Sequence, residues 1–543
     1  MISMKNWSKR SLNGAVKVAC GLIVIALLPW LPRVKGVSVV MQHNDLARTG
    51  ANISETILSP ANVNTSNFGK IFTDTLDGQV YAQPLYVENL SISNGTHNVV
   101  FVCTENNTVY ALDADTGGIT YWRTNLGTPY TSPTCNDLTP VVGITGTPVI
   151  DLSSGTLYVD TKLATPAHKL HALDLITGSE KFGGPVTIAA LNFSAAVQAQ
   201  RPGLLLLNGI VYLGFGSHCD QGSYHGFEMG YNATNLTQQV AVFNTSPSGS
   251  EAAIWSGGMA PAVDTNGNLY IMTGNGTFDG ASNFGECMVK LNGSLVVQDY
   301  ATPANWSNLN TGDTDFGSGG AVLLPPHYVT GIGKDGMLYL ADINNMGHVG
   351  NFVQGFQADP SGGDTVGKSP VYWQGPVKQY LFVLHSNNAT KSFQFTGTNI
   401  MTTALGTSSF TMNDRCGGLS LSANGATNGV LWEIGSDSNL RAYDAVNFPK
   451  LLWSGSVGSY VKMTCPTIAN GKVYVGTSST LGVWGLTNYL YLKAAPPNPT
   501  VNWANGALVQ ANTLSGPWVT NPVVSPYTLV TTNTQMYFRL RIH

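Results

Sequence analysis

Charged residues are scarce in this chain. Only 10% of its 543 residues are Asp, Glu, Lys or Arg, and the formal net charge is −4. There is no basic cluster, which argues against nucleic acid as a partner, because phosphate binding needs a patch of Lys and Arg. Gly is abundant instead, with 61 residues. A low charge together with many Gly, Asn, Ser and Thr residues suits an exported all-β protein.

Cysteine motifs are also missing. The seven cysteines form no C-x-x-C pair and no adjacent pair, so neither a zinc site nor a thioredoxin-type centre is indicated. Cys103 and Cys287 lie inside strand-like runs, and we expect them to be small buried residues. In an oxidising compartment some of the others could pair.

Long apolar runs are absent beyond the N-terminus. There, an apolar run from residue 18 to residue 31 follows a basic stretch made of Lys5, Lys9, Arg10 and Lys17. This is the pattern of a signal peptide, and the run is short for a membrane span. No A-x-A cleavage site follows, so an uncleaved anchor stays open as an alternative. We assign residues 1–36 to a signal peptide or anchor and expect a secreted, periplasmic or cell-surface protein, with any membrane contact made through this segment.

The chain does contain a repeated phrase: an apolar run beside Pro or Gly, then a Gly turn, a short strand and a second strand. Clear copies occupy residues 147–159 and 466–476. The copies open near Pro84, Pro148, Pro202, Pro261, Gly320, Pro370, Leu419 and Pro466. Intervals of roughly 47 to 64 residues are in the range of four-stranded propeller blades rather than helical repeats.

Eight such units predict a closed ring, which leaves only short sheet edges. The last unit lacks an outer strand, and residues 68–73, which precede the first unit, are expected to supply it. The predicted fold is therefore an all-β, eight-bladed β-propeller over residues 37–490, followed by a Pro-rich linker at 491–502 and a small C-terminal β module at 503–543. A two-domain β-sandwich is the alternative, and the regular spacing disfavours it.

Two loops of this propeller carry cysteines. Cys135 lies in the connection between the first two units, and Cys219 lies between two strands of the third. Loops of these two classes share one face of a propeller, so we predict a disulfide between them. The bond requires that the two Cα atoms lie within about 7 Å of each other.

The repeat resembles that of the quinoprotein dehydrogenases over most of residues 42–488. In that family pyrroloquinoline quinone (PQQ) and a calcium ion lie on one face near the ring axis. Residues 270–276 (YIMTGNG) resemble the family's T-G-N segment, which implies that Asn275 is a calcium ligand. Residues 313–320 are similar in placement to the segment with the catalytic base, which also touches calcium. The resemblance implies Asp313 in this role, with Asp315 as the alternative.

Two further segments extend the resemblance. Residues 333–339 (GKDGMLY) resemble the family's K-N-G-x-x-Y segment, which implies that Lys334 contacts the quinone. In the third unit Gln221 takes the place of a family Glu, so Asp220 becomes the third candidate metal ligand, and His225 takes the place of an Arg. Arg201 precedes a strand near the expected axis and is a candidate for binding the cofactor or another anion.

The chemistry of this set is coherent. Calcium prefers carboxylate and amide oxygens, a carboxylate beside a cation stays ionised and can act as a base, and a Lys beside a quinone oxygen stabilises developing negative charge. Each residue also has a structural interpretation. Asn275 suits a turn, Asp313 and Asp315 can cap a loop, and Lys334 can be an exposed charge.

The chain also departs from the family's pattern. The adjacent cysteine pair is missing, residues 259–261 (MAP) stand where a platform Trp is expected, and no C-x-x-C-H motif can attach a c-type haem. These departures favour a binding or scaffold module with a degenerate site, for a small molecule or a protein. The alternative is a divergent dehydrogenase that oxidises an alcohol or sugar with PQQ and calcium. We expect a monomer in both cases.

The C-terminal end has a second resemblance. Residues 515–518 (SGPW), 525–527 (SPY) and 537–541 (YFRLR) resemble parts of the small terminal β modules of bacterial exported proteins. The resemblance covers about forty residues, and it implies a fold but no function for this segment.

Overall fold

The protein is built almost entirely of β-strands in a computed structural model, which describes residues 16–18, 38–131, 135–360, 370–413, 417–487, 490–493, 500–503, 507–512, 517–525, 527–529 and 536–541. These residues contain one α-helix, α1 (Trp306–Thr311). None of the helices in the described ranges is long and apolar enough to cross a membrane. Apart from residues 16–18, the predicted signal peptide or anchor lies outside the described residues up to position 37.

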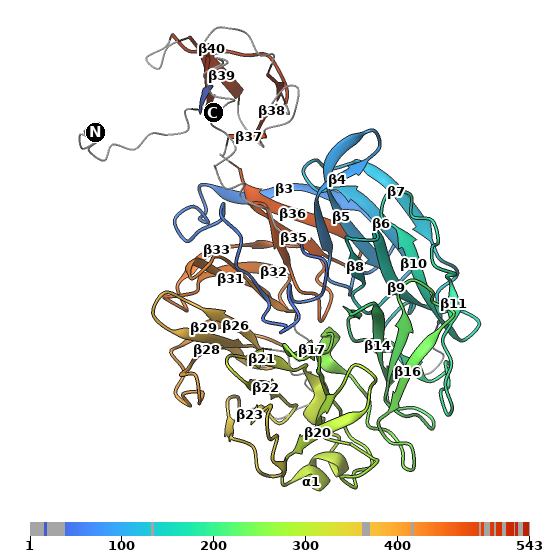
Figure 1. The fold of residues 1–543 in the computed structure, drawn as a ribbon. Helices are drawn as coiled ribbons and strands as arrows, with labels where there is room; N and C mark the ends of the chain where they lie inside the picture. Colours follow the sequence, from blue (N-terminus) through green and yellow to red (C-terminus); the bar gives the residue numbers. More distant parts are fainter. Residues whose placement is uncertain are drawn as a thin grey trace, which may run out of the picture. The chain divides into compact units, whose positions relative to one another are not determined.

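The chain divides into two compact units. The larger comprises residues 36–61 and 72–483, and the smaller comprises residues 1–35, 62–71 and 484–543. The sheets of the larger unit are arranged around a common centre (Figure 1). They form the expected all-β propeller, and the domain boundaries given above remain predictions.

Eight sheets of four or five strands follow the repeat in chain order within the described residues. The first four sheets are made of β4 (Leu85–Ile92), β5 (Gly95–Thr104), β6 (Thr108–Asp113) and β7 (Thr120–Asn125); β8 (Val149–Asp151), β9 (Thr156–Leu163), β10 (Ala167–Asp174) and β11 (Val186–Thr187); β12 (Gln198–Ala199), β13 (Leu205–Leu207), β14 (Ile210–Ser217), β15 (Phe227–Asn232) and β16 (Gln239–Asn244); and β17 (Ala262–Val263), β18 (Leu269–Met272), β19 (Met288–Leu291), β20 (Val297–Thr302) and β24 (His348–Val349).

The other four complete the series, which is consistent with eight blades. They are made of β21 (Val322–Leu324), β22 (Tyr328–Ile332), β23 (Met337–Asp342) and β25 (Gln354–Gln357); β26 (Val371–Gln374), β27 (Gln379–Val383), β28 (Ala389–Phe395) and β29 (Gly406–Thr411); β2 (Ala51–Asn52), β30 (Leu419–Asn424), β31 (Thr427–Ile434), β32 (Asn439–Asp444) and β33 (Leu451–Ser456); and β3 (Phe68–Thr75), β36 (Thr480–Leu486), β35 (Lys472–Gly476) and β34 (Thr467–Ala469).

The last of these sheets has the strand order β3-β36-β35-β34, so the N-terminal strand is its outer strand. Two backbone hydrogen bonds flank this pairing: Leu76 N–H donates to the Ser479 carbonyl, and Thr487 N–H donates to the Asn67 carbonyl, each at 2.8 Å. The expected pairing of residues 68–73 with the last repeat is observed in this order.

Apolar side chains fill the space between neighbouring sheets. Phe101 of β5 and Leu157 of β9 belong to one buried cluster, and Tyr86 of β4 and Tyr474 of β35 belong to another. The two tyrosine rings lie 5.8 Å apart, so the first and last sheets pack together in the larger unit. Central strands such as β5 and β14 are buried along most of their length because both of their faces pack on neighbours.

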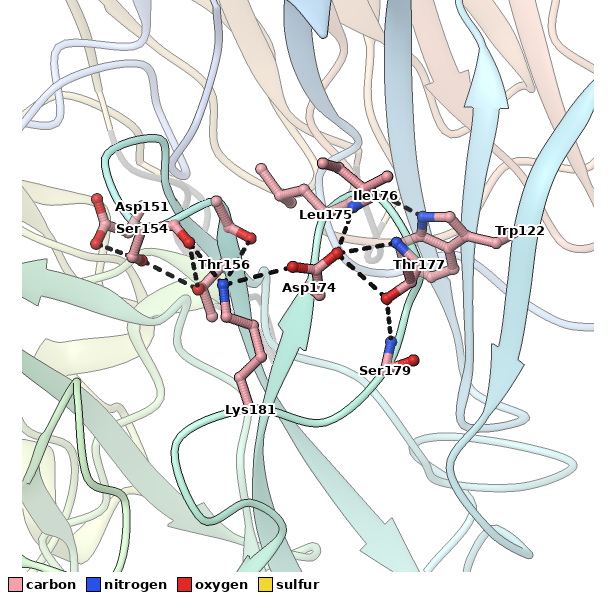
Figure 2. Close-up of polar contacts among 11 residues, drawn as sticks. Trp122, Asp151, Ser154, Thr156, Asp174, Leu175, Ile176, Thr177, Ser179 and Lys181 are labelled. Carbon is pink, nitrogen blue, oxygen red and sulfur yellow. Dashed lines mark hydrogen bonds and ion pairs between the residues drawn. The ribbon is translucent and has the colours of Figure 1, made fainter. Parts of the chain in front are cut away.

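The repeated Asp has a local role. Asp174 ends β10, and its carboxylate accepts hydrogen bonds from the backbone N–H groups of Ile176 and Thr177, each at 3.0 Å. Trp122 of the preceding sheet donates its indole N–H to the carbonyl of Leu175 in this turn at 2.9 Å (Figure 2). The side chain of Asp174 therefore stabilises this turn, which also accepts a hydrogen bond from the tryptophan of the neighbouring sheet.

The segment at residues 39–55 crosses the inner strands of the larger unit. Its backbone bonds successively to Tyr86, Ile150, Val263, Leu323, Tyr372, Leu421 and Ala423, which belong to six of the sheets. Arg48 in this segment is completely buried and donates to the carbonyls of Pro261 and Gln42 at 2.9 and 2.8 Å. The segment thus ties the inner ends of the sheets to one another.

The smaller unit contains two further sheets. They have the orders β1-β42-β39-β40 and β37-β38-β41. Their strands are β1 (Val16–Val18), β37 (Tyr491–Lys493), β38 (Thr500–Asn502), β39 (Ala507–Ala511), β40 (Val519–Thr520), β41 (Tyr527–Thr528) and β42 (Met536–Arg541). Because β37 and β38 lie within residues 491–502, both ends of the range expected to be a linker belong to this sheet.

Candidate functional site

Asn275 and Asp315 meet between the fourth and fifth sheets. Asn275 follows β18, and its backbone N–H donates to Asp315 Oδ1 at 2.9 Å. Asp315 is buried and precedes the short 3-10 turn η3 (Phe316–Ser318). Gly274 is needed here, because a Cβ atom at this position would collide with the Asp315 carboxylate. The side-chain oxygen of Asn275, a residue only 8% exposed, has no hydrogen-bond partner among the described residues.

Lys334 joins the two candidate aspartates. Its ammonium group lies 2.6 Å from Asp315 Oδ2 and 3.2 Å from Asp313 Oδ1. The Asp315 side chain is 4% exposed and that of Asp313 is 60% exposed, so the buried member of the pair is Asp315. Burial alone would lower the pKa of Lys334, but Asp315 and Asp313 raise it above its ordinary value. The ammonium group therefore neutralises much of the negative charge at this point.

Asp220 and Glu251 extend the acidic group. Tyr224 donates its hydroxyl to Asp220 Oδ1 at 2.5 Å. Burial, followed by the nearby charges of Asp315 and Asp313, raises the pKa of Asp220. Glu251 feels Asp220, Asp315 and Asp313 as well, and its pKa is also raised, mainly by burial. His225 forms an isolated β-bridge with Glu251. Its Nδ1 lies 2.9 Å from the Ser246 carbonyl, so the ring contacts the backbone of a neighbouring loop.

A second charged group surrounds Arg201. Its Nη2 and the Lys462 ammonium group both contact the carboxylate of Asp137. The Arg201 guanidinium lies over the ring of Trp255, 5.1 Å from its centroid. Trp255 is buried beside Gly216 and Gly274, so it connects this group with Asn275 and Asp315. Glu105 is buried nearby, and burial raises its pKa to about 7 despite the opposing effects of Arg201 and Lys462.

The loop that carries Asp137 is cross-linked. Cys135 and Cys219 form a disulfide with a Cα–Cα distance of 5.8 Å, which confirms the predicted pairing. Cys103 and Cys287 are buried, as expected. Cys416 lies outside the described residues 417–487.

Several nitrogen atoms near Arg201 are buried without a hydrogen-bond partner in the described part of the chain: Arg201 Nε, Trp255 Nε1 and His218 Nε2. Burial, then the charge of Lys162, lowers the pKa of His218 to about 3, so its imidazole is neutral. The cavity at Arg201 is small, about 10 Å³, and is lined by Gln42, Tyr81, Gln83, Thr145, Thr147, Arg201, Gly258, Met463 and Cys465. It has room for about one water molecule.

The structure thus brings Asn275, Asp313, Asp315 and Lys334 together, with Asp220 close to them and His225 at the margin. Asp137 and Lys462 could not be identified from the sequence, because both lie in loops that contain no motif. The resemblance placed an aromatic platform at residues 259–261, whereas Trp255, directly before the 3-10 turn η2 (Ser256–Gly258), lies at the site. Cys135, two residues before Asp137, was the one feature of the sequence that drew attention to this loop.

The residues fit the cofactors of the resembled family only in part. The unpaired oxygen of Asn275 suits a calcium ligand. However, Lys334 already pairs with both aspartates, and the described residues contain no group of three His, Cys, Asp or Glu side chains arranged to hold a metal ion. Arg201 covers Trp255, and the cavity beside it has no room for a tricyclic quinone. As arranged in the described part of the chain, the site offers one free oxygen ligand for calcium but no space for the quinone.

Solved structures share the fold of this chain. It superposes on a quinohaemoprotein alcohol dehydrogenase of Comamonas testosteroni with a TM-score of 0.60 and 15% identity over 88% of this chain and 83% of that one. The quinohaemoprotein alcohol dehydrogenase of Pseudomonas putida gives 0.59 and 14% over 85% and 82%. A europium-containing methanol dehydrogenase gives 0.59 and 14% over 83% and 98%. The chain therefore has the propeller fold of quinoprotein alcohol and methanol dehydrogenases.

No family model matches the chain. No curated protein matches it either.

Proposed function

We propose that this protein is an exported propeller that binds a ligand at Arg201 and does not use PQQ. The observation that carries the proposal is the guanidinium of Arg201, 5.1 Å above the ring of Trp255. An aromatic face that already stacks with a cation of the chain cannot also support a quinone. A guanidinium held over a ring in this way suits recognition of a negatively charged ligand instead.

The second candidate is a divergent dehydrogenase that oxidises an alcohol or sugar. It is favoured by one observation, the buried amide oxygen of Asn275 that has no partner among the described residues. In this case Asn275, Asp315 and Asp220 are the residues that would hold calcium, and Lys334 is the residue that would contact the quinone. Asp315, rather than the exposed Asp313, would be the base.

A thermal shift experiment separates the two functions. Ligands that bind the folded state raise the melting temperature with concentration. We expect wild-type protein to melt at the same temperature with and without saturating PQQ and calcium, and to reduce no dye in the presence of simple alcohols. A melting temperature that rises with PQQ, together with dye reduction that Asp315→Asn abolishes and Asp313→Asn retains, would establish the dehydrogenase.

A further inference from the structure

Two hydrogen-bond donors of the Arg201 group are buried without an acceptor in the described residues. Arg201 and Trp255 are 9% and 7% exposed, and Arg201 Nε and Trp255 Nε1, which can only donate, have no partner in the described ranges. His218 Nε2 is also unpaired and feels the charges of Arg201 and Asp137. A buried unpaired donor costs about 1–3 kcal/mol, so the two unpaired N–H groups of Arg201 and Trp255 indicate a ligand with acceptor oxygens.

Asp137 supplies one such acceptor from within the chain. Its carboxylate contacts both Arg201 and Lys462, although these residues lie on separate connections, before β13 and before β34. The Asp137 side chain is 30% exposed, whereas Arg201 and Lys462 are buried, so the carboxylate lies on the more exposed side of the two cations. The disulfide between Cys135 and Cys219 fastens this loop two residues away. The disulfide therefore acts as a tether that holds the Asp137 carboxylate next to the two cations.

We propose that Arg201, Lys462 and Trp255 form a binding site for a small carboxylate, and that Asp137 occupies this site as an internal ligand. The inference rests on the proposed binding function and names its ligand class. Two cations provide charge-assisted hydrogen bonds to the carboxylate. The Trp255 ring provides an apolar wall, and the unpaired N–H groups provide further donors for ligand oxygens.

The tether determines when a free carboxylate binds. An attached group competes at an effective concentration in the millimolar range, so weak carboxylates cannot displace Asp137 while the loop is fastened. Reduction of the disulfide by a thiol reductant gives two thiols and releases the loop. The site then becomes available to a free carboxylate at lower concentration.

Chemical rescue tests the site. Asp137→Ala removes the internal carboxylate, and formate, which is small enough to replace it, is added up to about 100 mM against chloride at equal ionic strength. We expect the variant to melt about 3 °C below wild type and formate to recover at least half of this loss. Asp437→Ala is the matched control, because Asp437 also pairs with an arginine that is 10% exposed. Formate that stabilises both variants equally, or neither, would overturn the proposal.

A second variant and a second measurement keep the test decisive. Arg201→Gln combined with Asp137→Ala should abolish the formate effect, and persistence of the effect would contradict the assigned cation. If Asp137→Ala does not fold, Asp137→Asn replaces it. Calorimetric titration of wild-type protein with acetate should show binding about tenfold tighter after reduction than before. Equal binding in both states would disprove the role of the tether, and none of these outcomes depends on whether PQQ binds.

Discussion

Two arginines of this propeller occupy nearly identical surroundings. Arg201 and Arg441 each have a side chain that is 10% exposed and pairs with an aspartate that is 30% or 33% exposed, Asp137 or Asp437. Each guanidinium lies over an aromatic ring, 5.1 Å from the centroid of Trp255 and 3.6 Å from that of Phe410. Each also has a buried glutamate nearby, Glu105 or Glu433, and burial raises the pKa of both glutamates to about 7.

The two differ in how the partners are assembled. Asp437 is four residues from Arg441 in the same hairpin and accepts two hydrogen bonds, at 3.0 and 2.5 Å, in the bidentate arrangement that fixes a guanidinium most firmly. Asp137 is 64 residues from Arg201 and contacts only its Nη2, while Nε has no partner in the described residues. Arg441 therefore completes a structural clamp, and Arg201 retains donors for a ligand.

The largest effect is expected at the clamp. Arg441→Ala removes the cation that lies 3.7 Å from the fully buried Glu433, as well as the partner of Asp437. Breaking a buried pair in this way should lower the free energy of unfolding by about 3–5 kcal/mol, measured by chemical denaturation. A loss below about 1 kcal/mol would show that the two arginines do not differ as described.

The disulfide should come next. Replacing Cys135 and Cys219 by serine frees the loop of Asp137 and should lower the free energy of unfolding by about 2–4 kcal/mol. The Arg441 clamp is local to its hairpin, so the double-serine variant and Asp437→Ala should have additive effects. A strong coupling between these distant changes would contradict the separation of the two regions.

The two buried glutamates predict matching pH profiles. A carboxyl whose folded pKa is raised from 4.5 to about 7 contributes its full stability below pH 4.5 and loses it as the pH rises through 7. The wild-type free energy of unfolding should fall between these pH values. Glu105→Gln and Glu433→Gln should each reduce this fall by about 1–3 kcal/mol. Melting curves at pH 4.5, 6 and 7.5 measure this change, and an unchanged slope in either variant would refute the assignment for that site.

The smallest effect is expected for Arg201→Gln. Lys462 still pairs with Asp137 in this variant, so the free energy of unfolding should fall by only about 1 kcal/mol. The same denaturation measurement as for Arg441→Ala gives the comparison. A loss as large as that of Arg441→Ala would mean that Arg201 is a structural residue rather than part of a binding site.

Much of the fold follows from local rules in the sequence. Each predicted repeat opens at a strand or within three residues of its start, because the Gly turns and the short strands depend on residues close in the chain. The disulfide was predicted from loop classes alone. The resemblance implied Asp313, with Asp315 as the alternative, but the sequence could not show that Asp315 precedes a 3-10 turn and is buried while Asp313 is exposed.

Such local rules could not predict the group of side chains around Arg201. Asp137 and Lys462 are 325 residues apart and belong to loops with no repeated pattern, so only closure of the ring brings them together. Arg201 itself was a candidate for anion binding, but its partner could not be read from the sequence. Loop side chains of this kind are positioned by tertiary structure rather than by local preference.

Retention of quinone by the wild-type protein tests the central claim most directly. Protein incubated with PQQ and calcium is passed over a desalting column, and the absorbance of the quinone is measured in the protein fraction. If Arg201 covers Trp255 as described, the protein should emerge without quinone. Quinone that elutes with the protein in equimolar amount and is released by a calcium chelator would contradict this account.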